Sequence, residues 1–347
     1  MNGISRNKKE IFLEVYFKRT LPLLHIKEGG DEVLKFLINR LGQSVILLLI
    51  VTIITFFLIN LAPGGPASTM RMDATPEDRQ AMIEKLGLDQ PIIVRYIDWI
   101  TNAVQGDLGT SFTSSEPVIQ RIAERLPYTI ELTIFTILIS VFFGILFGVL
   151  SAVKRGKAQD HVINFFSVIG LSVPAFWLGL MLILLFSITL GWLPSSGVGP
   201  RGADFDLMGW ILHLILPVLI LTTTVLPNIV RFTRSSMLEV ISQNYIRTAR
   251  AKGAKESVVL YVHALRNALI PIITIIGMLI PRLLSGAVIT EAIFGWTGIG
   301  TLIIEAARGR DYPLVMGVTV VITVVVVVSN LLVDLLYSRV DPRVKNV

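Results

Sequence analysis

The stretch QNYIRTARAKGAKESVVLYVHALRNALIP, residues 243–271, is a basic polar segment between two long apolar runs. Apolar residues lie between its charged ones: Ala249, Val258, Val259 and Tyr261. This alternation predicts two short amphipathic helical pieces over residues 245–264, broken at Gly253. Glycine is the expected elbow, because it adopts the backbone angles that end one helix before the next begins. The stretch is therefore predicted to be a docking loop.

The composition around this loop is that of a membrane protein. Of 347 residues, 53% are hydrophobic and only 16% are charged, and the mean hydropathy is +0.70. These values are far too apolar for a water-soluble domain. The chain has no cysteine, which excludes disulfides, thiolate catalysis and thiolate metal sites. The net charge of +6 is better interpreted through the positions of Lys and Arg than as a nucleic-acid footprint, so we expect the lipid bilayer and no nucleic acid as a partner.

Six apolar runs are long enough to cross a hydrocarbon layer of ~30 Å as helices. They lie at residues 41–62, 132–153, 162–193, 207–230, 267–294 and 312–337. The third run is longer than one straight span needs and contains Pro174, so we expect a kink or break near residues 173–179. Gly144 and Gly148 in the second run are spaced to let another helix approach closely. The expected fold class is an all-α polytopic membrane protein with six transmembrane helices.

Basic residues set the expected orientation. They gather at residues 154–157 and 231–266, which predicts that these sides, and with them the N and C termini, are cytoplasmic. The predicted parts are a cytoplasmic N-terminal arm at 1–40, the first transmembrane helix at 41–62, an external loop or cap at 63–126, a core domain at 127–343 with five transmembrane helices, and a cytoplasmic tail at 344–347. Within the arm, residues 11–17 and 33–38 are expected to form short helices on the membrane surface.

Two phrases of the docking loop carry a family resemblance. Residues 245–253 and 263–271 fit Y-x-R-T-A-R-A-K-G and H-A-L-R-N-A-L-x-P throughout. In this the chain resembles the permease subunits of bacterial ATP-binding-cassette importers, in their dipeptide/oligopeptide/nickel branch. The broader superfamily consensus is matched only at Ala249, Gly253 and Leu265. Five further phrases extend the resemblance over about residues 41–343: GLDQP (87–91), GDLGTS (106–111), ERLPYTIEL (124–132), FGWTGIG (294–300) and GRDYP (309–313).

The resemblance implies a type I importer permease fold in a bacterial or archaeal inner membrane. It implies that the chain forms half of a translocation pore for oligopeptides or dipeptides, with a second, related permease as its partner in a heterodimer. Two ATP-binding-cassette ATPase subunits and an external substrate-binding protein would complete the importer. ATP and magnesium would be used by the ATPase subunits, and no cofactor is expected in this chain. Segment 63–126 would form an external cap near the pore mouth, where the binding protein docks.

The resemblance also implies that residues 243–266 are the coupling loop that sits in a groove of an ATPase subunit. The candidate coupling residues are Ala249, Arg250, Lys252, Gly253, Ala254 and Glu256. A basic loop held to acidic lipid is the alternative, although it leaves the position of the glycine unexplained. Arg282 lies well inside the fifth run, where a charge is costly, and is therefore a candidate for the translocation path. Ser285, Gly286 and Phe176 are assigned to the same path, and a structural pairing of Arg282 with the second permease is the alternative.

No motif for covalent chemistry is present. The chain has no G-x-x-x-x-G-K-[ST] phosphate loop, no HExxH and no GxSxG, and its four histidines have no metal-ligand spacing. We therefore expect a protein that is not an enzyme. A nickel-chelate, glutathione or oligosaccharide cargo stays open within the importer class. A stand-alone secondary transporter would need intramembrane carboxylates or broken helices in repeated halves, whereas Glu131, Glu291 and Asp334 lie near span ends and are interpreted as interfacial carboxylates. A membrane-bound sensor or scaffold would leave the docking loop unexplained.

Overall fold

The computed structural model describes residues 30–61, 80, 83, 87, 89–202 and 205–340, and the side chains of most of these. The chain divides into two compact units, Met1–Leu47 with Arg343–Val347 and Leu48–Pro342. The second unit contains all the contacts described below. The predictions for residues 11–17, for the tail 344–347 and for the GLDQP phrase at Leu88 lie wholly or partly outside the described residues.

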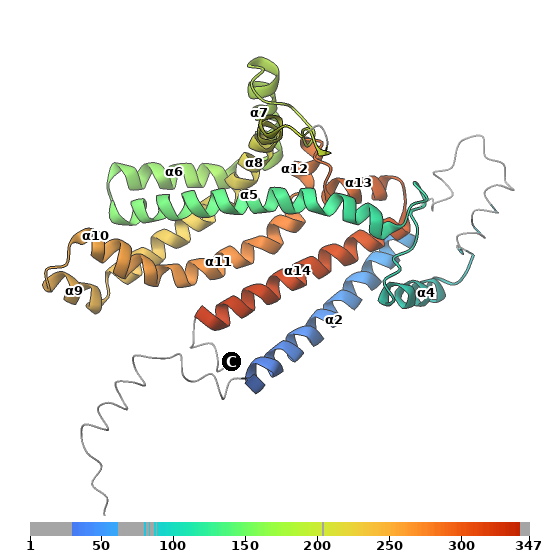
Figure 1. The fold of residues 1–347 in the computed structure, drawn as a ribbon, viewed down its shortest axis with the longest axis horizontal. Helices are drawn as coiled ribbons and strands as arrows, with labels where there is room; N and C mark the ends of the chain where they lie inside the picture. The colour runs from blue at the N-terminus through green and yellow to red at the C-terminus, as the bar shows by residue number, and fades with distance from the viewer. Residues whose placement is uncertain are drawn as a thin grey trace, which may run out of the picture. The chain divides into compact units, whose positions relative to one another are not determined.

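The described part of the chain is helical, and no strand occurs in it apart from an isolated antiparallel bridge between Thr110 and Pro117. Its elements, shown in Figure 1, are α2 (Gly30–Leu61), α4 (Ile92–Val104), α5 (Val118–Val153), α6 (Ala158–Ser172), α7 (Ala175–Leu182), the π-helix η3 (Ile183–Thr189), α8 (Leu207–Ile241), α9 (Asn244–Ala251), α10 (Glu256–Val258), the π-helix η5 (Val259–Ala264), α11 (Leu265–Gly286), α12 (Val288–Ile293), α13 (Ile299–Arg308) and α14 (Tyr312–Val340).

The helix lengths confirm a polytopic membrane protein. In the described residues, four helices are long and apolar enough to cross a membrane, in α2, α5, α8 and α14. Two bent pairs bring the count to six if each pair is one span: α6 with α7–η3, bent by 100°, and a segment from Glu256 to Leu283, bent by 47°. The first bend confirms the break predicted at Pro174. Val173 is extended there, with ψ of 125°, because a proline disfavours the helical conformation of the residue before it.

Several helices differ from those expected from the sequence. Helix α2 begins at Gly30, so residues 33–38 belong to the helix of the first span and are no separate surface helix. Helix α5 begins at Val118, inside the predicted external loop, and contains Pro127. At 36 residues and ~1.5 Å per residue it is much longer than the hydrocarbon layer, so its charged first part extends the helix beyond it. Helix α13 was not predicted at all.

The core is built where α5 crosses α8. A Cβ atom on Gly144 would lie 2.5 Å from Cγ2 of Ile229, and one on Gly148 would lie 2.4 Å from Cβ of Thr233. Such distances leave no room for a side chain, so these two glycines permit the close approach that their spacing predicted. Helix α11 packs against α8 and α14, and α6 packs against α5 and α8 (Figure 1). The docking loop, which contains α9 and α10, directly follows the C-terminal end of α8.

Candidate functional site

The predicted elbow at Gly253 closes helix α9 by a defined hydrogen-bonded turn. Gly253 has a φ of +81°, the left-handed region that favours glycine. Its N–H donates to the carbonyl of Arg250 over 2.9 Å, and the N–H of Ala254 donates to the carbonyl of Ala249 over 3.3 Å. This pair of bonds is the Schellman pattern that ends many helices at a glycine. The prediction of two helical pieces separated at Gly253 is confirmed, with Lys255 preceding the second piece.

The inner face of the coupling segment, as we call residues 243–266, rests on the ends of α5 and α8. Ile246 of α9 is fully buried, and Ala249 and Ala254 are half-buried in the same apolar cluster. The remaining buried members of that cluster are Val149, Ala152, Met237, Val259, Ala264 and Ala268. Ala249 therefore packs within the chain itself. Helix α9 thus shares one apolar cluster with residues of α5 and α8.

The outer face of the segment is charged and exposed. Arg250 donates to Glu256 from Nη2 over 2.7 Å and from Nε over 3.1 Å, across the turn at Gly253. These hydrogen bonds raise the pKa of the Arg250 guanidinium above its ordinary value. Lys252 is exposed beside the pair. Tyr245 accepts a hydrogen bond of 2.9 Å from Asn267 and so ties α9 to the start of α11. Exposed ion pairs contribute ~0–1 kcal/mol, so this pair shapes the surface more than it stabilises the fold.

The structure assigns the candidate path residues to two helices. Arg282 lies near the C-terminal end of α11 and is exposed, and residues 285 and 286 follow it on the same helix. Phe176 is exposed at the start of α7, which packs against α8 and α12. The coupling residues are thus gathered at one turn, whereas the path residues are spread over separate elements. Their role in a path stays a prediction.

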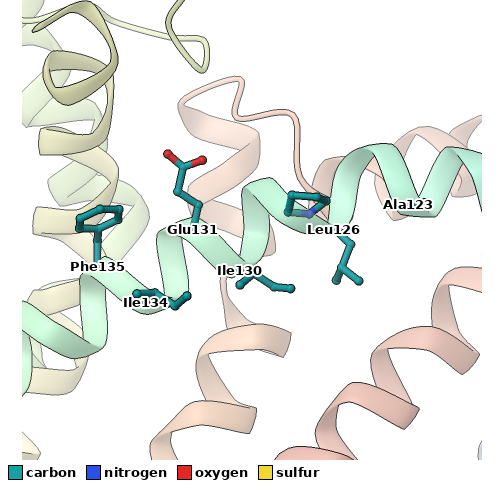
Figure 2. A pocket seen from close by; sticks show the side chains of 7 residues that line it. Ala123, Leu126, Ile130, Glu131, Ile134 and Phe135 are labelled. Carbon is teal, nitrogen blue, oxygen red and sulfur yellow. The ribbon is translucent and has the colours of Figure 1, made fainter. Parts of the chain in front are cut away.

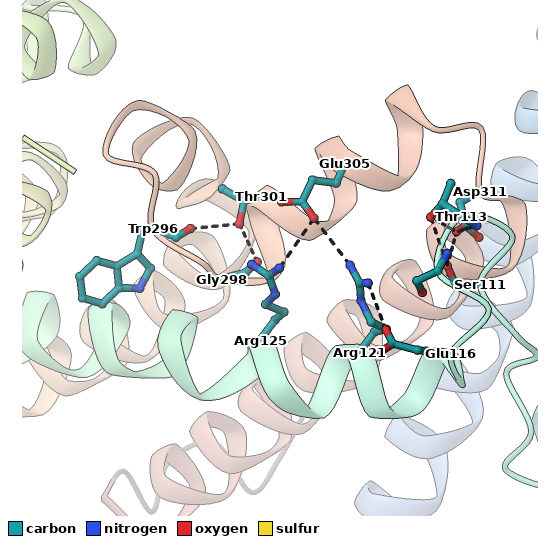
Figure 3. Close-up of polar contacts among 11 residues, drawn as sticks. Ser111, Thr113, Glu116, Arg121, Arg125, Trp296, Gly298, Thr301, Glu305 and Asp311 are labelled. Carbon is teal, nitrogen blue, oxygen red and sulfur yellow. Dashed lines mark hydrogen bonds and ion pairs between the residues drawn. The ribbon is translucent and has the colours of Figure 1, made fainter. Parts of the chain in front are cut away.

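A buried carboxylate joins two of the family phrases that are far apart in sequence. Asp311 of GRDYP is fully buried and accepts hydrogen bonds from the hydroxyl groups of Ser111, over 2.5 Å, and Thr113, over 2.8 Å. Its other oxygen accepts from the backbone N–H of Leu314 over 3.2 Å, which caps the start of α14. Figure 3 shows Ser111, Thr113 and Asp311 converging at one point. The GDLGTS and GRDYP phrases are therefore two halves of one structural unit.

A second buried carboxylate, Glu291, corrects a prediction. Its interpretation as an interfacial carboxylate was wrong, because the side chain is fully buried. It accepts hydrogen bonds from the hydroxyl of Thr129, over 2.6 Å, and from the N–H of Thr301, over 3.1 Å. A Cβ on Gly298 would lie 2.3 Å from Oε1 of Glu291, which explains a glycine in the FGWTGIG phrase. The carboxylate thus fastens this phrase to the ERLPYTIEL phrase on α5.

Trp296 and Glu305 also connect the segment that follows Glu291 to α5. Trp296 is fully buried and its indole N–H donates to the carbonyl of Tyr128 over 3.0 Å. Glu305 of α13 lies 3.8 Å from Arg121 and 3.9 Å from Arg125, both on the extended part of α5 (Figure 3). The charges on the first part of α5 therefore have partners on α13. Helix α13 packs against α5.

A shallow, open depression of largely apolar lining lies on α5 around Pro127. Figure 2 shows its lining residues, with Glu131 and Leu126 on opposite sides of the helix. Glu131 pairs with Arg201, N to O 3.0 Å, and accepts a hydrogen bond from the indole of Trp210. The guanidinium of Arg201 also lies 5.1 Å from the ring centre of Tyr128. Glu131 therefore has partners on the loop after η3 and on α8, which its position near a span end did not predict.

Comparisons with known proteins match nearly the whole chain. Residues 144–346 match the family described as binding-protein-dependent transport system inner membrane component, and residues 33–133 match its N-terminal companion. The oligopeptide transport system permease protein AppB of Bacillus subtilis (strain 168) is 46% identical over 89% of this chain and 99% of its own length. The chain belongs to this permease family. Among the described residues, no group of three or more His, Asp or Glu could hold a metal ion.

Other relatives of this permease have a similar sequence identity. The di/tripeptide transport system permease protein DppB of Pseudomonas aeruginosa (strain UCBPP-PA14) is 42% identical over 90% of this chain and 99% of its own, and the dipeptide permease DppB of Escherichia coli (strain K12) is 39% identical over the same shares. A solved structure of the MetNI methionine ABC transporter, described as inward facing, covers 65% of this chain and 99% of its own, with a TM-score of 0.54 and 20% identity. This likeness supports the fold of an importer permease.

Proposed function

We propose that this permease is one of two pore-forming subunits of an ATP-driven importer of oligopeptides or dipeptides. The observation that carries the proposal is the coupling segment, whose Gly253 turn presents a charged outer face while Ile246 and Ala249 are seated on α5 and α8. The cargo class is supported by relatives named for oligopeptides, di- and tripeptides and dipeptides. The other pore half is a related permease, in a heterodimer in the bacterial or archaeal inner membrane.

ATP is hydrolysed, with magnesium, by two separate ATPase subunits that bind the coupling segment from the cytoplasm. This chain is not an enzyme. An ATPase can drive a membrane bundle only through contacts whose free energy differs between its states. Ile246 and Ala249 supply such contacts, because they connect the ATPase-facing surface with α5 and α8. An external binding protein delivers cargo on the side of the membrane where Asp311, Glu291 and α13 lie.

Arg282, Ser285, Gly286 and Phe176 line the translocation path in this proposal. The positive charge of Arg282 suits the terminal carboxylate of a peptide. Replacement of Arg282 by glutamine is expected to weaken uptake while the complex still assembles. Uptake that is unchanged at normal assembly would remove Arg282 from the path.

Reconstitution tests the function. The chain is purified with its neighbouring subunits, placed in proteoliposomes and supplied with binding protein, ATP and a radiolabelled dipeptide or oligopeptide. The expected result is co-purified ATPases and uptake that requires ATP. Competition by a nickel chelate, glutathione or an oligosaccharide, and not by peptides, would change the cargo class. Uptake by this chain alone would instead identify a secondary transporter.

A further inference from the structure

A single carboxylate, that of Asp160, joins three helices at the end of the α5–α8 crossing. Its side chain is buried, and Oδ1 accepts hydrogen bonds from Ser151 Oγ over 2.5 Å and Asn164 Nδ2 over 2.7 Å. Its Oδ2 accepts from the N–H of Gly156 over 2.9 Å. Arg234 donates to both oxygens, over 2.8 Å from Nε and 2.9 Å from Nη2. Helix α5, the turn after it, α6 and α8 are therefore connected at one point.

This connection adjoins the surface on which the coupling segment rests. Ser151 precedes Ala152 on α5, and Arg234 lies one helical turn before Met237 on α8. Ala152 and Met237 are both buried and belong, with Ile246 of α9, to the cluster beneath the coupling segment. Residues three or four apart on a helix are neighbours on its surface. The partners of Asp160 on α5 and α8 thus lie close in sequence to residues of the cluster on which α9 rests.

We propose that Asp160 is a positioning residue for energy coupling. Together with Arg234 it holds α5, α6 and α8 as one body, so that a displacement of the coupling segment moves all three helices. The proposal rests on the proposed function, in which ATPase subunits act on that segment.

The chemistry of the pair suits this role. Apolar contacts between helices tolerate sliding, whereas a bidentate arginine–carboxylate pair fixes both distance and orientation. The carboxylate has only acceptor oxygens, and every group around it is a donor. Asparagine at position 160 would keep the shape but turn an N–H₂ group toward a donor and remove the counter-charge of Arg234. The variant Asp160→Asn is therefore a test of charge and hydrogen bonding at nearly constant volume.

The experiment measures ATP hydrolysis and cargo uptake on the same proteoliposomes, made with the complete complex, its binding protein and a dipeptide. The readout is cargo taken up per ATP hydrolysed. Asp160→Asn and Arg234→Gln are each expected to lower this ratio at least ~5-fold while the ATPases still co-purify in normal amount. The double variant should lose no more than either single variant, because both changes remove the same interaction. A purely structural pair would lower the amount of complex and leave the ratio unchanged.

A matched control and a milder variant complete the test. Lys157→Gln removes an exposed charge three residues from Asp160 and should leave the ratio unchanged. Ser151→Ala keeps the ion pair and removes one hydrogen bond, so it should give a smaller decrease. If both charge variants fail to assemble, the Ser151→Ala complex becomes the test. A normal ratio of cargo to ATP in that complex overturns the proposal. A normal ratio in an assembled Asp160→Asn complex overturns it as well. A wild-type complex that takes up no cargo contradicts the proposed function instead.

Discussion

Backbone conformation at Gly253 makes that residue hard to replace. Nothing lies within 4 Å of a Cβ built there, so space is not the constraint. The constraint is φ of +81°, which costs a residue with a side chain roughly 1–2 kcal/mol, and more for a β-branched one. We expect Gly253→Val to abolish ATP-dependent uptake while the protein is still inserted, as measured in membrane vesicles.

Asparagine provides the control for this substitution, because it tolerates the left-handed region. Gly253→Asn should therefore retain most of the uptake. Equal loss of uptake in the valine and asparagine variants would show that the side chain, and not the backbone angle, is what matters at this position.

The Glu291 carboxylate connects the FGWTGIG phrase to the ERLPYTIEL phrase on α5. Glutamine is nearly isosteric, but its N–H₂ group would face either the Thr129 hydroxyl or the Thr301 N–H, which now donate to the carboxylate. An unsatisfied buried donor costs ~1–3 kcal/mol. We expect Glu291→Gln to lower the thermal unfolding midpoint of the detergent-purified complex. Glu305→Gln, at an exposed position, should not lower it, and equal shifts for the two variants would contradict the argument.

At the scale of elements, the crossing of α5 and α8 depends on the absence of side chains. A Cβ on Gly148 would meet the backbone carbonyl oxygen of Val230 at 2.9 Å as well as Thr233, and a backbone atom cannot rotate away. We expect Gly148→Ala to destabilise the complex by ~1–3 kcal/mol, the usual cost of overpacking, as measured by thermal unfolding. Leu146→Ala removes a half-exposed side chain two residues away and should cost less. A smaller effect for Gly148→Ala than for Leu146→Ala would show that the helices separate at little cost.

The elements also show what could be predicted from sequence. Apolar runs gave the spans, and Pro174 gave the break between α6 and α7, because both depend on local chemistry. The start of α5 was missed because Arg121, Arg125 and Pro127 resemble loop residues, whereas the two arginines pair with Glu305 of α13. The burial of Glu291 and Asp311 was missed for the same reason: their partners lie more than 100 residues away. The roles of the candidate coupling and path residues stay predictions.

At the scale of the whole molecule, orientation in the membrane decides whether the coupling segment can meet an ATPase. The chain has no cysteine, so single introduced cysteines can be labelled without background. Gln105 and Ser196 are exposed at the ends assigned to the outside, and Lys157 and Lys255 are exposed at the end assigned to the cytoplasm. Each position is changed to cysteine and treated with a membrane-impermeant maleimide in sealed cells.

The expected outcome is labelling of Gln105→Cys and Ser196→Cys in intact cells, and labelling of Lys157→Cys and Lys255→Cys only after permeabilisation. The physical reason is the excess of Lys and Arg in the segments around residues 154–157 and 231–266, which favours retention of these segments on the cytoplasmic side. Permeabilised cells control for accessibility, because all four cysteines are at exposed positions and should react there. Reaction of Lys255→Cys in sealed cells would place α9 and α10 outside the cell, where no ATPase could bind them, and would overturn the coupling role together with the orientation.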